Sequence, residues 1–116
     1  MSDAAPIRRT PLATPRLEAP KLVERVQITE IVLEPGQATG AHTHPIPVVG
    51  YIVRGRIRFQ IDAQPPHELQ AGQAFYEPAE TPILHFDNAS LSEPATFVAC
   101  YLLGQADHEL ILPLPS

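Results

Sequence analysis

The stretch EPGQATGAHTHPIPVVGYIVRG, residues 34–55, holds the features that decide the fold and the candidate site. A turn signal, Pro35-Gly36, precedes two histidines, His42 and His44. Because side chains at positions i and i+2 of a strand point to one face, the two imidazoles are expected to project side by side. Such a pair can bind one metal ion, although a metal site needs further ligands. The alternative is two surface histidines beside a proline-rich turn.

Proline is over-represented along the whole chain, with 14 residues among 116. Since proline disrupts helices and central strands, it divides the chain into segments that are too short for most helices. Segment 56–62 alternates apolar and polar residues, which is typical of a strand, and segment 95–103 is almost entirely apolar, which favours a strand buried on both faces. Short strands between turn residues predict an all-β sandwich or barrel.

The pattern predicts eight strands, at residues 22–33, 41–44, 48–54, 56–62, 67–69, 74–77, 83–88 and 95–103. The third and fourth of these are expected to form a hairpin around Gly55. Arg54, Arg56 and Arg58 would bind an anionic substrate if they faced inward, but a solvated outward stripe is the favoured interpretation.

The composition excludes several classes of partner. The net charge is −5 and the longest basic cluster is Arg8-Arg9, so nucleic acid is not expected as a partner. A single cysteine, Cys100, excludes a disulfide framework and a cysteine-based zinc site. Neither a membrane-length apolar run nor an apolar signal-peptide region is present. A cytoplasmic protein without a membrane partner is expected.

The positions of Gly36, His42, His44 and Gly55 resemble the first motif of the small cupins. That motif places a glutamate between the histidines and the last glycine, but Val48 stands at its position here. The resemblance extends over roughly residues 25–103.

The second cupin motif is partly present. Gly72 and Pro78 match it, whereas Glu80 stands at the position of a glycine and Ile83 at that of the histidine. His85 follows two residues later and is expected on the same strand face as Ile83.

The resemblance implies an RmlC-like jelly roll, or double-stranded β-helix barrel, with a pocket between its sheets. Residues 21–112 would form the barrel, preceded by a proline-rich arm at 1–20 and followed by a tail at 113–116. The arm could be disordered or could lie on a partner subunit. A homodimer is expected, because dimers in the family cover strand edges and apolar outer surface.

The resemblance also implies a divalent metal ion (Fe, Ni, Zn or Mn) bound by His42, His44 and His85. A bulge caused by Thr81-Pro82 could bring His85 into register. Otherwise His85 would be a lone, hydrogen-bonded group in the pocket. Three neutral histidines would leave open positions for water or substrate.

Tyr76 directly precedes the second-motif turn and is the candidate catalytic proton donor or acceptor, the alternative being a core residue with a hydrogen-bonded hydroxyl. Glu77 and Glu80 are expected to be solvated, and His67 and His108 to lie on the surface.

These features favour a small metalloenzyme that acts on a small organic substrate by dioxygenase- or isomerase-type chemistry. The alternative is a non-catalytic cupin with a degraded metal site, which binds or senses a small ligand. A third interpretation resembles the metal-free sugar-nucleotide epimerases of the superfamily, which use a His-Asp pair and a tyrosine. His85 and Asp87 could form such a pair. The substrate, the metal and the reaction stay open.

Overall fold

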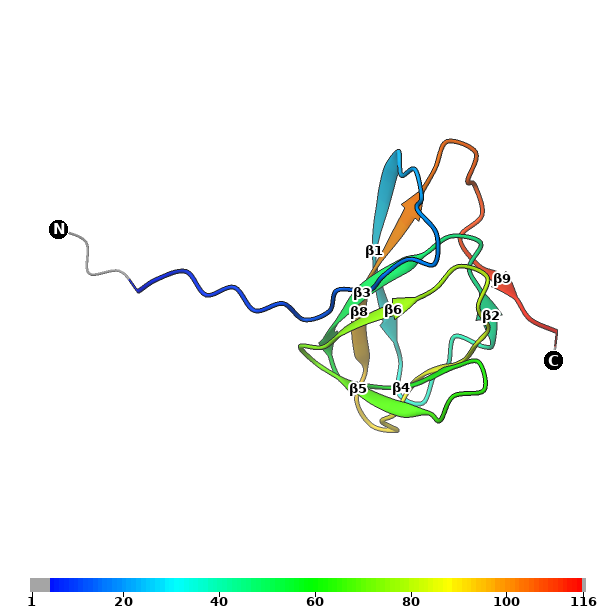
Figure 1. The fold of residues 1–116 in the computed structure, drawn as a ribbon. Coiled ribbons are helices and arrows are strands. Elements are labelled where there is room, and N and C mark those ends of the chain that lie inside the picture. The colour runs from blue at the N-terminus through cyan, green and yellow to red at the C-terminus, as the bar shows by residue number, and fades with distance from the viewer. Residues whose placement is uncertain (1–4, 116) are drawn as a thin grey trace.

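The computed structural model describes residues 5–115, which form a barrel of two antiparallel sheets (Figure 1). One sheet has the order β1-β8-β3-β6 and the other β5-β4-β7-β2-β9. The strands are β1 Arg25–Leu33, β2 His42–Thr43, β3 Val48–Arg54, β4 Arg56–Ile61, β5 His67–Gln70, β6 Ala74–Glu77, β7 Ile83–Asn88, β8 Ala95–Leu103 and β9 Leu112–Pro113. The predicted all-β jelly-roll class is confirmed. No helix in the described residues could span a membrane.

The strand β8 is the centre of the first sheet, where it pairs with β1 over its whole length and with β3 on its other side. Every second residue of β8, from Ala95 to Leu103, is buried, and the residues between them are half-buried. The apolar run of β8 therefore serves the core with one face, while its other face is only partly covered. Complete burial of both faces was predicted and is not observed.

The strands β3 and β4 do not form the predicted hairpin, because they belong to different sheets. The chain crosses between the sheets at Gly55, whose φ is 88°. A Cβ there would lie 2.9 Å from the Ala95 Cα, so both the backbone conformation and the close approach require glycine. Alternation in sequence shows which side chains face the core, but it does not show which strands pair.

The strand β7 contains one extra residue between Ile83 and His85 relative to its partner β4. A bulge of this kind moves the following side chains to the opposite face. Ile83, Phe86 and Asn88 are buried, whereas His85 and Asp87 are half-buried. The expectation that His85 shares a face with Ile83 is therefore wrong. An irregularity was anticipated here, but it turns His85 away from the core.

Four phenylalanines, Phe59, Phe75, Phe86 and Phe97, form an aromatic cluster between the sheets, with ring centroids 4.6 to 6.3 Å apart. Each such pair adds about 0.5–1.5 kcal/mol beyond the burial of its area. A Cβ on Gly50 would lie 2.2 Å from the Phe75 ring, so glycine makes room for the cluster. Three of these rings, those of Phe75, Phe86 and Phe97, also line the cavity of the site described next.

The two termini lie differently on the barrel. The described part of the N-terminal arm, residues 5–20, contains no strand and extends away from the barrel at its beginning (Figure 1). No strand was predicted after residue 103, but the C-terminal segment contributes β9, which pairs with β2. The C-terminus is thus part of the structure that holds the histidines.

Candidate metal centre

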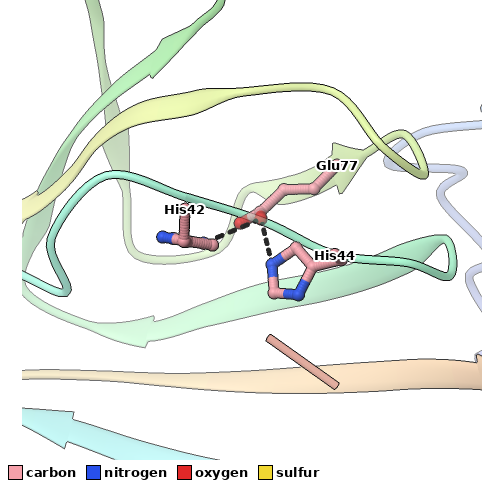
Figure 2. Close-up of side chains that lie close together, drawn as sticks. All are labelled: His42, His44 and Glu77. Carbon is pink, nitrogen blue, oxygen red and sulfur yellow. Dashed lines mark hydrogen bonds and ion pairs between the residues drawn. The ribbon is translucent and has the colours of Figure 1, made fainter. Parts of the chain in front are cut away.

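Three side chains that can bind a metal ion meet inside the barrel: His42, His44 and Glu77 (Figure 2). One potential ligand atom of each lies within 4.8 Å of the others. Glu77 Oε2 is 2.7 Å from His44 Nε2 and 3.6 Å from His42 Nε2. Each residue is at most 5% exposed. In the part of the chain that the structure describes, no other group of three or more such residues has this geometry.

Strand β2 positions His42, and His44 directly follows the last residue of this strand. His42 and His44 are buried while Thr43 between them is half-buried, which is the alternation expected of extended backbone. The strand lies between β7 and β9, and His42 pairs with Ile83 on one side and Pro113 on the other. The expectation that the two imidazoles project side by side is confirmed, since their ring centroids are 4.8 Å apart.

Backbone carbonyl groups hold both imidazole rings. The Nδ1 of His42 donates to Gly40 O and the Nδ1 of His44 to Leu110 O, both at 2.7 Å. Because a carbonyl oxygen only accepts, each Nδ1 carries a hydrogen and each Nε2 is directed at Glu77. Metal-binding histidines are commonly oriented in this way. The 2.7 Å contact between His44 Nε2 and Glu77 Oε2 also requires one shared proton, which a bound metal ion would replace.

Leu110 belongs to a segment that we call the C-terminal strap, residues 104–114. The strap begins at a fixed point, where Asp107 Oδ2 accepts hydrogen bonds from Lys21 Nζ at 2.8 Å and Gly104 N at 2.7 Å. These two hydrogen bonds lower the pKa of Asp107. At its other end, Leu114 N donates to Ala41 O. The strap therefore supplies the carbonyl that orients His44 and is secured on both sides of it.

Glu77 and His42 shift each other's protonation. Burial alone would raise the pKa of Glu77, but hydrogen bonds and charge interactions with His42 and His44 outweigh it and lower that pKa. Burial alone would lower the pKa of His42, but hydrogen bonds with Glu77 and Gly40 and the Glu77 charge raise it above 6.5. Without metal, the site thus favours a carboxylate beside a protonated histidine. An ion that binds here must displace protons.

Glu77 takes the place of the missing first-motif glutamate. It lies on β6 directly opposite Val48 on β3, and both residues line the same cavity. Since opposite residues on paired strands have adjacent side chains, Glu77 brings a carboxylate beside the position that the motif assigns to glutamate. The expectation that Glu77 is solvated is wrong, because it is 4% exposed. The alternation of β6 held the signal: Phe75 and Glu77 share one face.

The same alternation places Tyr76 on the opposite face of β6. Tyr76 lies beside residues 17–21, where the N-terminal arm joins the barrel, and burial together with the charge of Glu18 raises its pKa. It is not among the described residues that line the cavity next to Glu77. The structure therefore does not bring Tyr76 together with the three ligand-type side chains, and its catalytic role stays a prediction.

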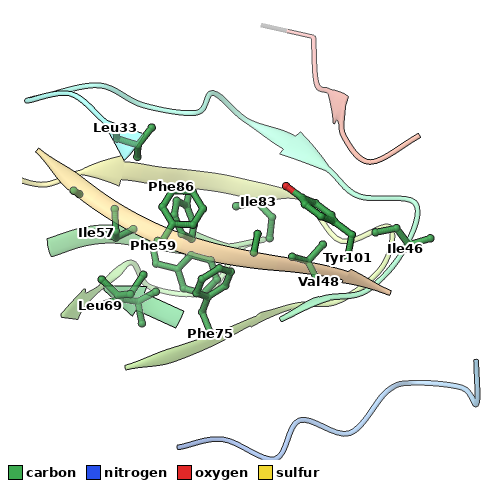
Figure 3. Packing of buried hydrophobic residues seen from close by; sticks show 14 of the residues in the cluster. Leu33, Ile46, Val48, Ile57, Phe59, Leu69, Phe75, Ile83, Phe86 and Tyr101 are labelled. Carbon is green, nitrogen blue, oxygen red and sulfur yellow. The ribbon is translucent and has the colours of Figure 1, made fainter. Parts of the chain in front are cut away.

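A cavity of about 340 Å³ adjoins the three ligand-type residues. Its other walls are mainly apolar and come from both sheets and the strap: Thr29, Ile31, Thr39, Val48, Phe75, Phe86, Phe97, Ala99, Tyr101 and Ile111. Figure 3 shows Tyr101 and Val48 together near one end of the core. Burial and the charge of Glu77 raise the pKa of Tyr101. Its hydroxyl therefore stays protonated at neutral pH and can donate a hydrogen bond in the cavity.

His85 forms a separate pair on β7. Its Nδ1 is 2.7 Å from Asp87 Oδ2, and its side chain is 37% exposed. The His-Asp pair considered from the sequence therefore exists, but on the half-buried face of the strand. His85 is outside the compact group of His42, His44 and Glu77, and metal binding by His85 stays a prediction.

Comparisons with known proteins agree with this architecture. The chain superimposes on the DMSP lyase DddQ from Ruegeria pomeroyi DSS-3 with a TM-score of 0.63 and 18% identity, covering 76% of this chain and 42% of the lyase. For oxalate decarboxylase from Bacillus subtilis the TM-score is 0.67 and the identity 21%, over 79% of this chain and 24% of the decarboxylase. The chain thus spans less than half the length of either enzyme.

A further structural relative is the protein TT1209 from Thermus thermophilus, with a TM-score of 0.60 and 26% identity over 71% of this chain and 76% of that protein. No curated protein matches the chain in sequence. The family model for the cupin domain matches residues 29–101, which include both histidines, Glu77 and most of the strands. This chain therefore belongs to the cupin domain family.

Proposed function

We propose that this cupin binds one divalent metal ion through His42, His44 and Glu77, and that a small organic molecule binds beside the ion in the adjoining cavity. The observation that carries the proposal is the convergence of two Nε2 atoms on Glu77 Oε2, with both Nδ1 atoms held by backbone carbonyls. Two imidazoles and one carboxylate suit Fe(II) well, and Zn, Ni and Mn are also compatible with these donors.

The residues around the ion have separate tasks in this proposal. A bound divalent ion supplies Lewis acidity to a donor atom of the substrate. The apolar walls exclude water from that atom. Tyr101 donates a hydrogen bond to the substrate from the wall beside His44, whose ring centroid is 5.9 Å from that of Tyr101. Dioxygenase- and isomerase-type reactions both fit this arrangement.

A binding cupin without catalysis is the second candidate. It is favoured by the direct hydrogen bond between His44 and Glu77. Among the described residues, every buried side-chain nitrogen or oxygen has a hydrogen-bond partner. The group of His42, His44 and Glu77 therefore has its hydrogen bonds satisfied without an ion, and it could serve as a polar wall that binds a small ligand.

Metal content separates the two candidates. We would load the wild type, Glu77→Gln, His42→Ala and His85→Ala with Fe(II), Ni(II), Zn(II) and Mn(II), and measure bound metal by elemental analysis after dialysis. The proposal expects one ion per chain in the wild type and in His85→Ala, and loss of the ion in the other two variants. Loss in His85→Ala with retention in Glu77→Gln would establish the three-histidine site instead. Absence of metal from every sample would favour the binding protein.

We also propose that the protein is a cytoplasmic homodimer. Val26, Ile28 and Val32 project from one face of β1 and are 48%, 70% and 50% exposed. Apolar side chains gathered on one strand face commonly mark an interface, and a second copy would cover them. Light scattering after gel filtration would give twice the chain mass for the wild type and the chain mass for Ile28→Glu. A monomeric wild type would contradict the proposal.

A further inference from the structure

The described walls of the cavity carry no positively charged side chain that could bind an anion in addition to the proposed metal ion. Apart from the two histidines, the described lining residues include no basic side chain. Arg54, Arg56 and Arg58 lie on the surface, where the first two pair with Glu93 and Glu68. These arginines were the residues that could have bound an anionic substrate. A negative charge that enters the cavity can therefore be balanced only at the metal centre.

The charge of the centre itself limits the ligand. A divalent ion with the Glu77 carboxylate and two neutral imidazoles has a net charge of +1. One anionic donor atom of a ligand makes the centre neutral. A second negative group on the ligand would lie without a partner against buried walls such as Phe86 and Phe97, which are 1% and 4% exposed. Burying an unpaired charge is strongly unfavourable.

The apolar walls also indicate the chemistry of the rest of the ligand, beyond its anionic donor group. Phe75, Phe86 and Phe97 contact one another with centroid distances of 4.6 to 6.0 Å, and all three line the cavity. An aromatic ring in the cavity would pack against these rings edge to face or in offset stacking. Tyr101 also lines the cavity, and its phenolic hydroxyl can donate a hydrogen bond to an oxygen atom of the ligand.

We infer that the cavity binds a molecule with a single negative charge, carried by one oxygen donor group on an aromatic body. We also infer that it discriminates against dianions. This inference rests on the proposed metal site. It adds a substrate class: aromatic monocarboxylates, phenols or enols rather than dicarboxylates.

Calorimetry with the Zn(II)-loaded protein tests the charge limit. We would titrate 4-methylbenzoate, terephthalate and acetate, because the first two differ mainly in the charge of the para group and neither chelates one ion with both ends. The expected order places 4-methylbenzoate at least about tenfold tighter than terephthalate and than acetate. Equal or tighter binding of terephthalate would overturn the charge limit, and equal binding of acetate would overturn the aromatic body.

A gain-of-function variant keeps the test independent of damage to the core. Thr29 lines the cavity and is half-buried on β1, so Thr29→Lys would add a cation at the wall without removing a core side chain. Terephthalate binding is expected to improve about tenfold in this variant, with little change for 4-methylbenzoate. If a folded, zinc-loaded variant bound terephthalate no better than the wild type, this inference would be contradicted and the proposed function would stand. Failure of the wild type to hold zinc or any other of the four ions would remove the proposed function and this inference with it.

Discussion

The protein contains two histidine–carboxylate contacts of the same length in very different surroundings. His44 Nε2 meets Glu77 Oε2 at 2.7 Å inside the barrel, and His85 Nδ1 meets Asp87 Oδ2 at 2.7 Å on the half-buried face of β7. The first contact has His42 as a third group, carbonyl partners behind both rings and a cavity in front. The second has a 37% exposed imidazole. Distance alone does not make a site; burial, convergence and a second layer of hydrogen bonds distinguish the two.

The largest expected effect is a difference in metal affinity between substitutions of the two carboxylates, Glu77 and Asp87. Glu77→Gln keeps the size of the side chain but removes an anionic ligand, so metal affinity should fall by more than about 100-fold, beyond the range typical of outer hydrogen-bond partners. Asp87→Asn makes the matching change at the other pair and should leave the affinity within about twofold of the wild type. Competition with a chelator measures both. Similar losses in the two variants would mean that the pairs are not functionally distinct.

The next effect concerns the position of the buried carboxylate. Glu77→Val should lose metal, and Val48→Glu in the same chain should restore the affinity to within about tenfold of the wild type, because the two positions are directly opposite on β3 and β6. The same chelator competition applies, with circular dichroism to establish folding. A double variant that folds and binds as weakly as Glu77→Val would show that position 48 does not reach the ion.

A smaller effect is expected from the strap. Combining Lys21→Met with Asp107→Ala removes the contact that secures its first half, so the Leu110 carbonyl holds His44 less firmly and metal affinity should fall about tenfold. Glu109→Ala is the matched control, since Glu109 is exposed. The absorption spectrum of the Co(II)-loaded protein should change in the double variant but not in the control. An unchanged spectrum and affinity would remove the strap from the site.

The smallest expected effect is the change of stability and metal affinity with pH. Glu77 has a lowered pKa, so it stabilises the metal-free protein above pH 4.5 and loses this effect as the pH falls through the lowered value. His42 has a raised pKa, so its contribution is complete below pH 6.5 and is lost as the pH rises through the raised value. Metal affinity should rise over that same upper range, because protons no longer compete for His42.

Urea unfolding of the metal-free protein between pH 6 and 9 measures this pH dependence. The free energy of unfolding of the wild type should decline over this range, and the decline should be smaller in Glu77→Gln. A metal-free wild type that gains stability across this range would contradict the assignment of the buried pair.

Much of the fold could be predicted because strand and turn signals are local. The strands at 74–77, 83–88 and 95–103 follow directly from alternation and from the prolines and glycines at their ends. Strand pairing could not be predicted in the same way: the segments 48–54 and 56–62 both have strand signals and are joined at Gly55, as in a hairpin, although they enter different sheets. The strand β9 is too short to carry a pattern, and only its pairing with β2 reveals it.

The candidate site was predictable in its histidines and not in its carboxylate. His42 and His44 are two residues apart in sequence, so strand geometry alone brings them together. Glu77 lies on β6, in the other sheet from β2, and meets His44 across the barrel, 33 positions further along the chain. The face of Glu77 could have been deduced from Phe75 in the same strand. The bulge in β7 could not, because its effect on His85 depends on the partner strand β4.

Anomalous diffraction from crystals soaked with the metal that the protein retains tests the central claim most directly. The account predicts one strong peak within bonding distance of His42 Nε2, His44 Nε2 and a Glu77 oxygen. A peak beside His85 and Asp87, or a fully loaded protein whose peak omits Glu77, would contradict it.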